Sequence, residues 1–277
     1  MMKFYRIFYG FILRRRYRIS FKGMELLQKE GGKLVLPNHQ SHVDPQLVGV
    51  FFYKYTHIVP VVNENFFKIP FISFFLKRWG AIPVANFKKR NRDPNVLKNI
   101  FSKVNIALDE GKSVIIFPAG QLQDIGVEHV RNKQATHAVI SSLEDDKIRI
   151  IGVRITGLWG STFSKAWTGE QPPFLPVFLK GFFYFFANLI FLAPKREVTF
   201  ELVDITEEAL AQSKNDRITF NNYLDSFYNI NGIEEPSFIK HFFFFPKSKR
   251  KLPVNVVKKT EKWMAKAAQE KNQLVSD

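Results

Sequence analysis

A histidine and an aspartate separated by four residues are the side chains of this sequence best suited to chemistry. The short apolar run Leu34–Leu36 precedes a mostly polar stretch that holds His39 and Asp44. This pattern predicts a buried strand that ends in a turn and opens a helix. A carboxylate folded back on an imidazole fixes its tautomer and stabilises the charged ring, while the other nitrogen takes a proton from a hydroxyl. His39 and Asp44 therefore form a candidate general base.

The same residues have a purely structural interpretation. Asp44 followed by Pro45 is also a typical helix N-cap followed by a proline at the first helical position. In that interpretation the carboxylate only starts the helix, and His39 is an ordinary turn residue.

The whole string Asn-His-x-Ser-x-x-Asp after an apolar strand resembles the first motif of the glycerolipid acyltransferases, the family of lysophosphatidic acid acyltransferases. In that family the histidine is the base and the aspartate orients it, which implies these roles for His39 and Asp44. His42 occupies a variable position of the motif and is a second candidate for the base. The resemblance also places Asn38 and Ser41 in the expected substrate-binding set.

The segment Gly80–Asn86 resembles the second motif of the family. There the run commonly ends in an arginine that helps to hold the phosphate of the acceptor, and here Asn86 stands at that position. The cation Lys88 lies just beyond and either supplies the charge from a displaced position or belongs to a solvated turn. Asn86 and Lys88 are both included in the expected substrate-binding set.

The run Phe117–Leu122 follows a predicted buried strand, Ser113–Phe117, which should end at the same edge of the sheet as His39. It resembles the third motif, Phe-Pro-Glu-Gly-Thr-Arg, with Ala119 in place of the glutamate and Leu122 in place of the arginine. These two departures concern the identity of the acceptor more than the reaction. The expected substrate-binding residues in this run are Pro118, Gly120 and Gln121.

Further charged residues follow the third motif. Lys133 matches a lysine that the family has before a small-residue helix, here predicted over residues 134–143. Glu128 is either a substitute for the missing acid or a solvated loop residue. The strand Ile148–Ile155 resembles the fourth motif, and its Arg154 either reaches the surface or binds an anion at the site. Lys133 and Arg154 complete the expected substrate-binding set.

Composition narrows the partners. The 277 residues include thirty Phe and no Cys, 45% are hydrophobic, and the formal net charge is +16. The absence of Cys excludes disulfides, a thiolate nucleophile and Cys-based metal sites. A strongly basic balance indicates an anionic partner, either nucleic acid or a membrane surface. Aromatic clusters flanked by cations favour the membrane.

Three segments carry this aromatic and basic character. Residues 1–16 predict an interfacial helix, with packing on the protein's own core as the alternative. Phe174–Ala193 predicts a helical element that dips into the membrane. Residues 232–277 read as an aromatic and basic tail, in which Phe242–Phe245 and the cluster 247–251 suit reversible attachment. The alternative for this tail is a solvated segment after a small hydrophobic clasp.

The expected architecture is an α/β domain with a mixed sheet flanked by helices and an interfacial N-terminal helix. The domain should cover residues 17–231, between the segments 1–16 and 232–277. Within it, Arg196–Leu202 predicts an edge strand, Phe66–Trp79 a helix, and residues 206–228 a helix.

The resemblance implies that the protein moves an acyl chain from a thioester, on acyl carrier protein or coenzyme A, to the hydroxyl of a lysophospholipid or lysophosphatidic acid. It implies no metal and no tightly bound cofactor, and it predicts a role in phospholipid biosynthesis. The expected partners are an anionic membrane surface, the lysolipid and the thioester, but no nucleic acid. The expected location is the cytoplasmic face of a membrane. The alternative is a catalytically inactive protein of the same fold that binds membrane surfaces.

Overall fold

The computed structural model describes residues 2–276 apart from 85–93, 144–146, 246 and 248. The expected site residues Asn86 and Lys88 lie outside the described residues. The strands are β1 (Tyr17–Lys22), β2 (Lys33–Pro37), β3 (Ile58–Asn63), β4 (Ile82–Val84), β5 (Ser113–Ile115), β6 (Arg149–Thr156) and β7 (Arg196–Asp204). The α-helices are α1 (Met2–Arg16), α2 (Asp44–Phe52), α3 (Pro70–Arg78), α4 (Pro94–Asp109), α5 (Ala135–Ser141), α6 (Phe174–Ala187), α7 (Thr206–Ser213), α8 (Arg217–Tyr228) and α9 (Val254–Ser276), with 3-10 helices η1 (Met24–Gln28) and η2 (Glu64–Lys68).

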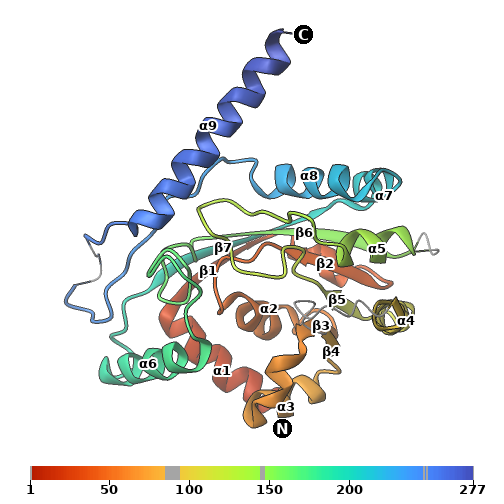
Figure 1. Cartoon of the computed structure of the whole chain (residues 1–277). Coiled ribbons are helices and arrows are strands. Elements are labelled where there is room, and N and C mark those ends of the chain that lie inside the picture. The colour runs from red at the N-terminus through yellow and green to blue at the C-terminus, as the bar shows by residue number, and fades with distance from the viewer. Residues whose placement is uncertain (1, 85–93, 144–146, 246, 248, 277) are drawn as a thin grey trace.

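The described residues form a seven-stranded sheet in the order β1-β7-β6-β2-β5-β3-β4 (Figure 1). Neighbouring strands are parallel except β6 and β7, which are antiparallel. The prediction of a mixed sheet flanked by helices is therefore confirmed. Since β2, β5 and β6 are mutually parallel, the loops that follow them leave from the same edge of the sheet.

Strand β2 lies in the middle of the sheet and is buried along its whole length. Leu34 and Leu36 belong to the core that α4, α5, α7 and α8 cover, whereas Val35 belongs to the core under α1, α2 and α6. Burial on both faces explains the continuous apolar run, and each buried leucine contributes about 1.5–3 kcal/mol relative to exposure. The strand that delivers His39 is thus fixed from both sides.

Three expectations about individual elements are wrong. β7 is not an edge strand, because it pairs with β1 on one side and β6 on the other. Its alternating sequence instead reflects one buried face and one partly exposed face. The segment 206–228 forms two helices, since Asp216 starts α8 by accepting hydrogen bonds from the N–H groups of Ile218 and Thr219. The segment 66–79 is divided between η2 and α3 at Ile69.

The aromatic helices α1 and α6 pack on the core with one face and expose the other. Tyr9 and Leu13 of α1 and Phe185 of α6 are buried. The exposed large residues on these helices and just after α6 are Ile7, Phe8, Phe11, Leu175, Leu179, Phe183, Phe186, Leu189, Phe191 and Leu192. No helix within the described residues combines the length and apolar character needed to cross a membrane.

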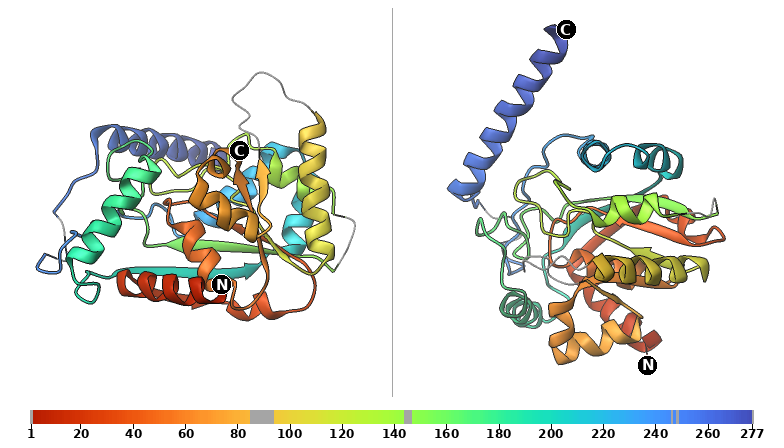
Figure 2. Two further views of the ribbon diagram at one scale, coloured as in Figure 1. Left: turned by 90° about the horizontal axis from the view of Figure 1, so that it is seen from below. Right: turned by 45° about the vertical axis from the view of Figure 1, so that its right-hand side comes forward.

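The C-terminal part is more structured than an aromatic and basic tail. Phe238 and Val256 are buried in a small cluster with Ile125, Val127 and Trp159. From this cluster α9 projects away from the body of the protein (Figures 1 and 2). The spacing of Val256, Thr260 and Trp263 along one helix face is the pattern that could have predicted it.

Candidate active site

The turn after β2 is fastened to the neighbouring strand by a side-chain amide. Asn38 donates from Nδ2 to the Ile155 carbonyl over 3.0 Å and accepts from the Ile155 N–H at Oδ1 over 2.6 Å. The amide is buried and makes both bonds to β6, so the structure gives Asn38 a positioning role. It does not present Asn38 to a substrate, as the sequence predicted.

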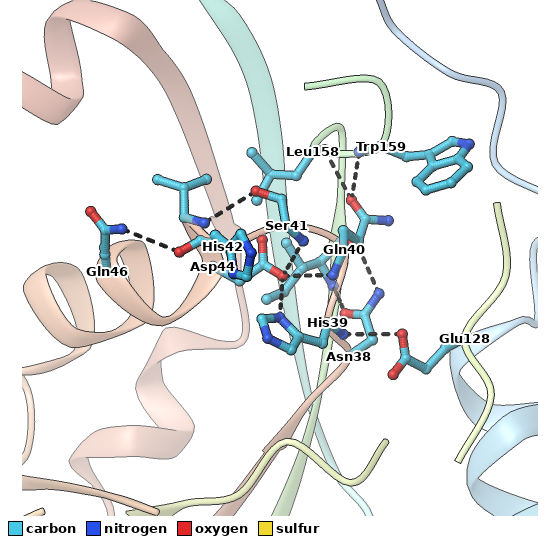
Figure 3. Close-up of polar contacts among 12 residues, drawn as sticks. Asn38, His39, Gln40, Ser41, His42, Asp44, Gln46, Glu128, Leu158 and Trp159 are labelled. Atoms are coloured by element: carbon cyan, nitrogen blue, oxygen red, sulfur yellow. Dashed lines mark hydrogen bonds and ion pairs between the residues drawn. The ribbon is translucent and has the colours of Figure 1, made fainter. Parts of the chain in front are cut away.

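His39 and Asp44 meet as predicted, and the contact is short. Nδ1 of His39 lies 2.9 Å from Oδ2 of Asp44 (Figure 3). The same carboxylate oxygen accepts the backbone N–H groups of Gln40 at 2.6 Å and Ser41 at 2.8 Å. Since backbone N–H groups can only donate, Oδ2 acts as an acceptor toward the ring as well. Nδ1 of His39 therefore carries the shared proton, and Nε2 keeps its lone pair.

Asp44 is not a helix cap. The N-cap position of α2 is Val43, which makes no side-chain cap, and the Asp44 carboxylate turns back to the preceding loop. Burial raises the pKa of the Asp44 carboxyl, while hydrogen bonds from His39, Ser41 and Gln40 act in the opposite direction. The structure thus favours the chemical interpretation of this residue over the capping interpretation.

The second candidate base, His42, faces another part of the protein. Its Nε2 lies 2.9 Å from the Pro172 carbonyl oxygen, and its ring packs edge-on against Phe174 at 5.6 Å between centroids. Burial lowers the pKa of His42 to about 4. The hydroxyl of Ser41, also expected at the substrate, is fully buried and accepts the Val43 N–H over 3.2 Å. Neither side chain is brought to the free nitrogen of His39.

The third motif reaches the same edge of the sheet as the first. The Phe117 ring lies 4.5 Å from the His39 ring, and the Gln123 N–H donates to the His39 carbonyl over 2.8 Å. Gly120 is exposed with φ +58°, and a Cβ there would lie 4.0 Å from Nζ of Lys133. Pro118 is buried and Gln121 is partly exposed. The structure therefore gathers this loop and Lys133 near His39, as expected.

Glu128 enters the site from the loop that follows. Its Oε2 accepts the backbone N–H of His39 over 3.0 Å, and its Oε1 is buried without a partner among the described residues. Burial raises the pKa of Glu128 to about 8, with a further rise from the nearby Asp44 and Asp225. The sequence left a substitute acid and a solvated residue as alternatives, and the structure excludes the solvated one.

Two residues of the site were missed by the sequence analysis. Gln40 accepts the N–H groups of Leu158 at 2.9 Å and Trp159 at 3.1 Å, and its amide donates to Glu234. Glu234 also accepts the Gly157 N–H over 2.7 Å. The buried polar Gln40 within the motif was a usable signal. Nothing local distinguishes Glu234 from a solvated acid, because its role depends on contacts distant in sequence.

Arg154 is held away from the site. Its Nε donates to Glu201 over 3.0 Å, its Nη1 donates to the Phe227 carbonyl over 3.2 Å, and its guanidinium lies 4.7 Å from the Phe227 ring centroid. These partners belong to β7 and α8, so the arginine stabilises the packing of α8 on the sheet. The expectation that it binds the substrate is not supported by this placement.

Metal ligands were searched among the described residues. No group of three or more His, Cys, Asp or Glu side chains there has the geometry to hold a metal ion.

The acyltransferase family model matches residues 18–156, which is half of the chain and contains the described site from Asn38 to Lys133. The protein therefore belongs to the acyltransferase family. No curated protein sequence matches the chain. Among solved structures, it is similar to PlsC, the 1-acyl-sn-glycerophosphate (LPA) acyltransferase of Thermotoga maritima, at 17% identity and a TM-score of 0.48, over 78% of this chain and 70% of that one.

We expect Glu128→Gln to gain stability relative to the parent as the pH rises from about 5 to about 8. Burial raises the pKa of Glu128 from 4.5 to about 8, so over this range the folded parent holds a proton that the unfolded chain has lost. The free energy of unfolding of the parent therefore falls with rising pH. The variant lacks this loss, and its amide oxygen can still accept the His39 N–H.

Thermal unfolding of both proteins at several pH values measures this difference. The exposed Glu30→Gln is the control for the change of charge alone. A stability difference between parent and Glu128→Gln that stays constant from pH 5 to pH 8 would contradict the assignment of Glu128 as a buried, protonated acid.

Proposed function

We propose that the protein is a lysolipid O-acyltransferase of phospholipid biosynthesis. In this proposal it moves an acyl chain from a thioester, on acyl carrier protein or coenzyme A, to the hydroxyl of a lysophospholipid or lysophosphatidic acid. The observation that carries the proposal is the contact between His39 and the buried Asp44 at 2.9 Å, within the segment that matches the acyltransferase family.

The proposed reaction uses the free nitrogen of His39. The acceptor hydroxyl gives its proton to Nε2, and its oxygen bonds to the thioester carbonyl carbon. The carbon–sulfur bond then breaks, and the leaving thiolate takes the proton from the imidazolium. Asp44 keeps the proton on Nδ1 throughout and stabilises the positive ring in the transition state. This sequence of steps needs no covalent intermediate on the protein.

A catalytically inactive protein that binds membrane surfaces is the second candidate. It would need the exposed aromatic side chains of α1 and α6 and the net charge of +16, but not a buried carboxylate aimed at a histidine. Burying a carboxylate carries a large desolvation cost. The burial of Asp44 behind His39, whose side chain is 14% exposed, therefore favours the enzyme.

Membrane association is part of the proposal and is compatible with either candidate. The exposed large residues of α1, α6 and the turn after α6 form an aromatic and aliphatic surface, and Arg14 and Arg15 lie at the end of α1. Aromatic side chains beside cations suit the boundary of an anionic bilayer. We therefore propose peripheral attachment at the cytoplasmic face.

Replacing His39 with Ala should lower kcat by about a hundred- to ten-thousand-fold, the usual contribution of a general base. Asp44→Asn should cause a loss of at least about a hundredfold, because the amide no longer fixes and stabilises the imidazolium. His42→Gln, which can still donate to the Pro172 carbonyl, should stay within about tenfold of the parent. Acyl transfer to detergent-dispersed lysolipid measures all three, and circular dichroism checks the fold.

The reverse pattern, with His42→Gln inactive and His39→Ala active, would move the base to His42 and break the match to the family motif. A folded parent that transfers no acyl group from either thioester to any lysolipid would favour the membrane-binding candidate.

We also propose that the preferred acceptor is not lysophosphatidic acid but a lysolipid without a phosphate monoester, such as a lysophosphodiester or an aminolipid. The resemblance places arginine and glutamate where this chain has the buried apolar residues Ala119 and Leu122. Arg154, which could have supplied charge, is engaged by Glu201. Among the described candidates, Lys133 remains near Gly120. A phosphate monoester would therefore lose charge-assisted contacts that contribute a few kcal/mol together.

Competition between lysolipids at equal concentration tests this acceptor. We expect the ratio of products to favour the lysophosphodiester or the aminolipid over lysophosphatidic acid, and Lys133→Gln to increase that preference. Lys29→Gln, at an exposed position on another loop, is the matched control. A clear preference for lysophosphatidic acid that survives Lys133→Gln would contradict the proposed acceptor.

A further inference from the structure

Helix α9 is anchored only near its start. Val256 is buried, and Asn255 donates to the Gly169 carbonyl over 3.1 Å. Trp263 packs against the same small cluster as Val256 and is partly buried. Beyond Trp263 the helix extends out from the protein, as Figures 1 and 2 show from different directions. Such a helix has a large surface that the rest of the described chain does not cover.

One face of α9 is basic. Lys258, Lys262 and Lys266 follow one another at intervals of four residues, and Lys259 lies on the same side. Glu261 lies on a different side of the helix, away from this row. All four lysines are exposed. Like charges at this spacing destabilise a helix slightly, and an acidic partner would reverse that effect.

This basic face begins close to the candidate active site. The Trp263 ring lies 6.2 Å from the His129 ring, and the residue before His129 is Glu128, which accepts the His39 N–H. A partner that lies along α9 would therefore stand beside the loop that carries Glu128. A flexible arm on such a partner could reach the free nitrogen of His39.

The basic face points away from the exposed aromatic surface. In Figure 1 α9 rises on one side of the sheet, whereas α1 and α6 lie on the other side, and the rotated view in Figure 2 agrees. A bilayer that receives Phe183 of α6 and Phe8 of α1 would leave α9 in the aqueous phase. The direction of the helix therefore favours a soluble anionic partner over a membrane.

We propose that the lysine face of α9 is the docking surface for an acyl carrier protein, a small acidic protein that presents its acyl thioester on a phosphopantetheine arm. This inference rests on the proposed function and selects its donor. The row from Lys258 to Lys266 is about 12 Å long at 1.5 Å per residue. A row of this length outside the site matches an acidic protein surface better than the compact phosphates of coenzyme A.

The test compares two full-length variants with equal changes of charge. The first is Lys258→Glu, Lys259→Glu and Lys262→Glu. The control is Lys22→Glu, Lys29→Glu and Lys214→Glu, at exposed positions on other elements. Each is titrated with a purified holo acyl carrier protein, and each is assayed with the carrier-protein and coenzyme A thioesters of the same acyl chain.

We expect the first variant to bind the carrier protein at least tenfold more weakly than the parent. Its ratio of kcat/KM for the carrier-protein thioester to that for the coenzyme A thioester should fall at least tenfold. The control should keep both quantities within about twofold of the parent. Binding by the parent should weaken as salt is raised, because the contact is between exposed charges.

Equal losses in the first variant and the control would overturn the proposal, since they would show an effect of net charge alone. Unchanged carrier-protein binding in the first variant would also overturn it. So would a loss confined to flotation with vesicles containing anionic phospholipid, which would assign the face to the membrane. If the parent transfers no acyl group from either donor, the proposed function fails, and the titration still decides whether the carrier protein docks on α9.

Discussion

Three hydrogen bonds that converge on one buried carboxylate oxygen hold the candidate active site together. Oδ2 of Asp44 accepts from the His39 ring and from the backbone N–H groups of Gln40 and Ser41. Without these donors, a carboxylate with no exposed surface would be strongly destabilised. Because two of the donors belong to the motif's own backbone, the turn cannot relax without breaking them. The buried charge, the turn and the orientation of the ring therefore depend on one another.

The turn is in turn held by the sheet and by two loops. Asn38 joins it to β6, and Gln40 joins it to the loop after β6 through the N–H groups of Leu158 and Trp159. Since β2 lies between β5 and β6, the segments that contact His39 all leave from one edge of the sheet. A reacting side chain supported by packed strands and by such hydrogen bonds is held more rigidly than one on a free loop.

Local patterns were enough to predict the central strand, the contact between His39 and Asp44, and the arrival of Phe117 at the same edge. These features depend on residues close in sequence or on the shared direction of parallel strands. The roles of Glu234 and Arg154 could not be predicted, because Glu234 reaches Gln40 and Arg154 reaches Glu201 across long stretches of chain. The alternation in β7 likewise reports a partly exposed face and says nothing about which strands lie beside it.

The central claim is that Asp44 keeps the proton on Nδ1 of His39 and leaves the lone pair on Nε2. Nitrogen-15 NMR of the imidazole side chains reports this tautomer directly, with His39 assigned by comparison with His39→Ala. At pH 8, where an ordinary imidazole is neutral, we predict an Nδ1–H tautomer in the parent and a mixture of tautomers in Asp44→Asn. A His39 ring that carries its proton on Nε2 in the parent would contradict the account.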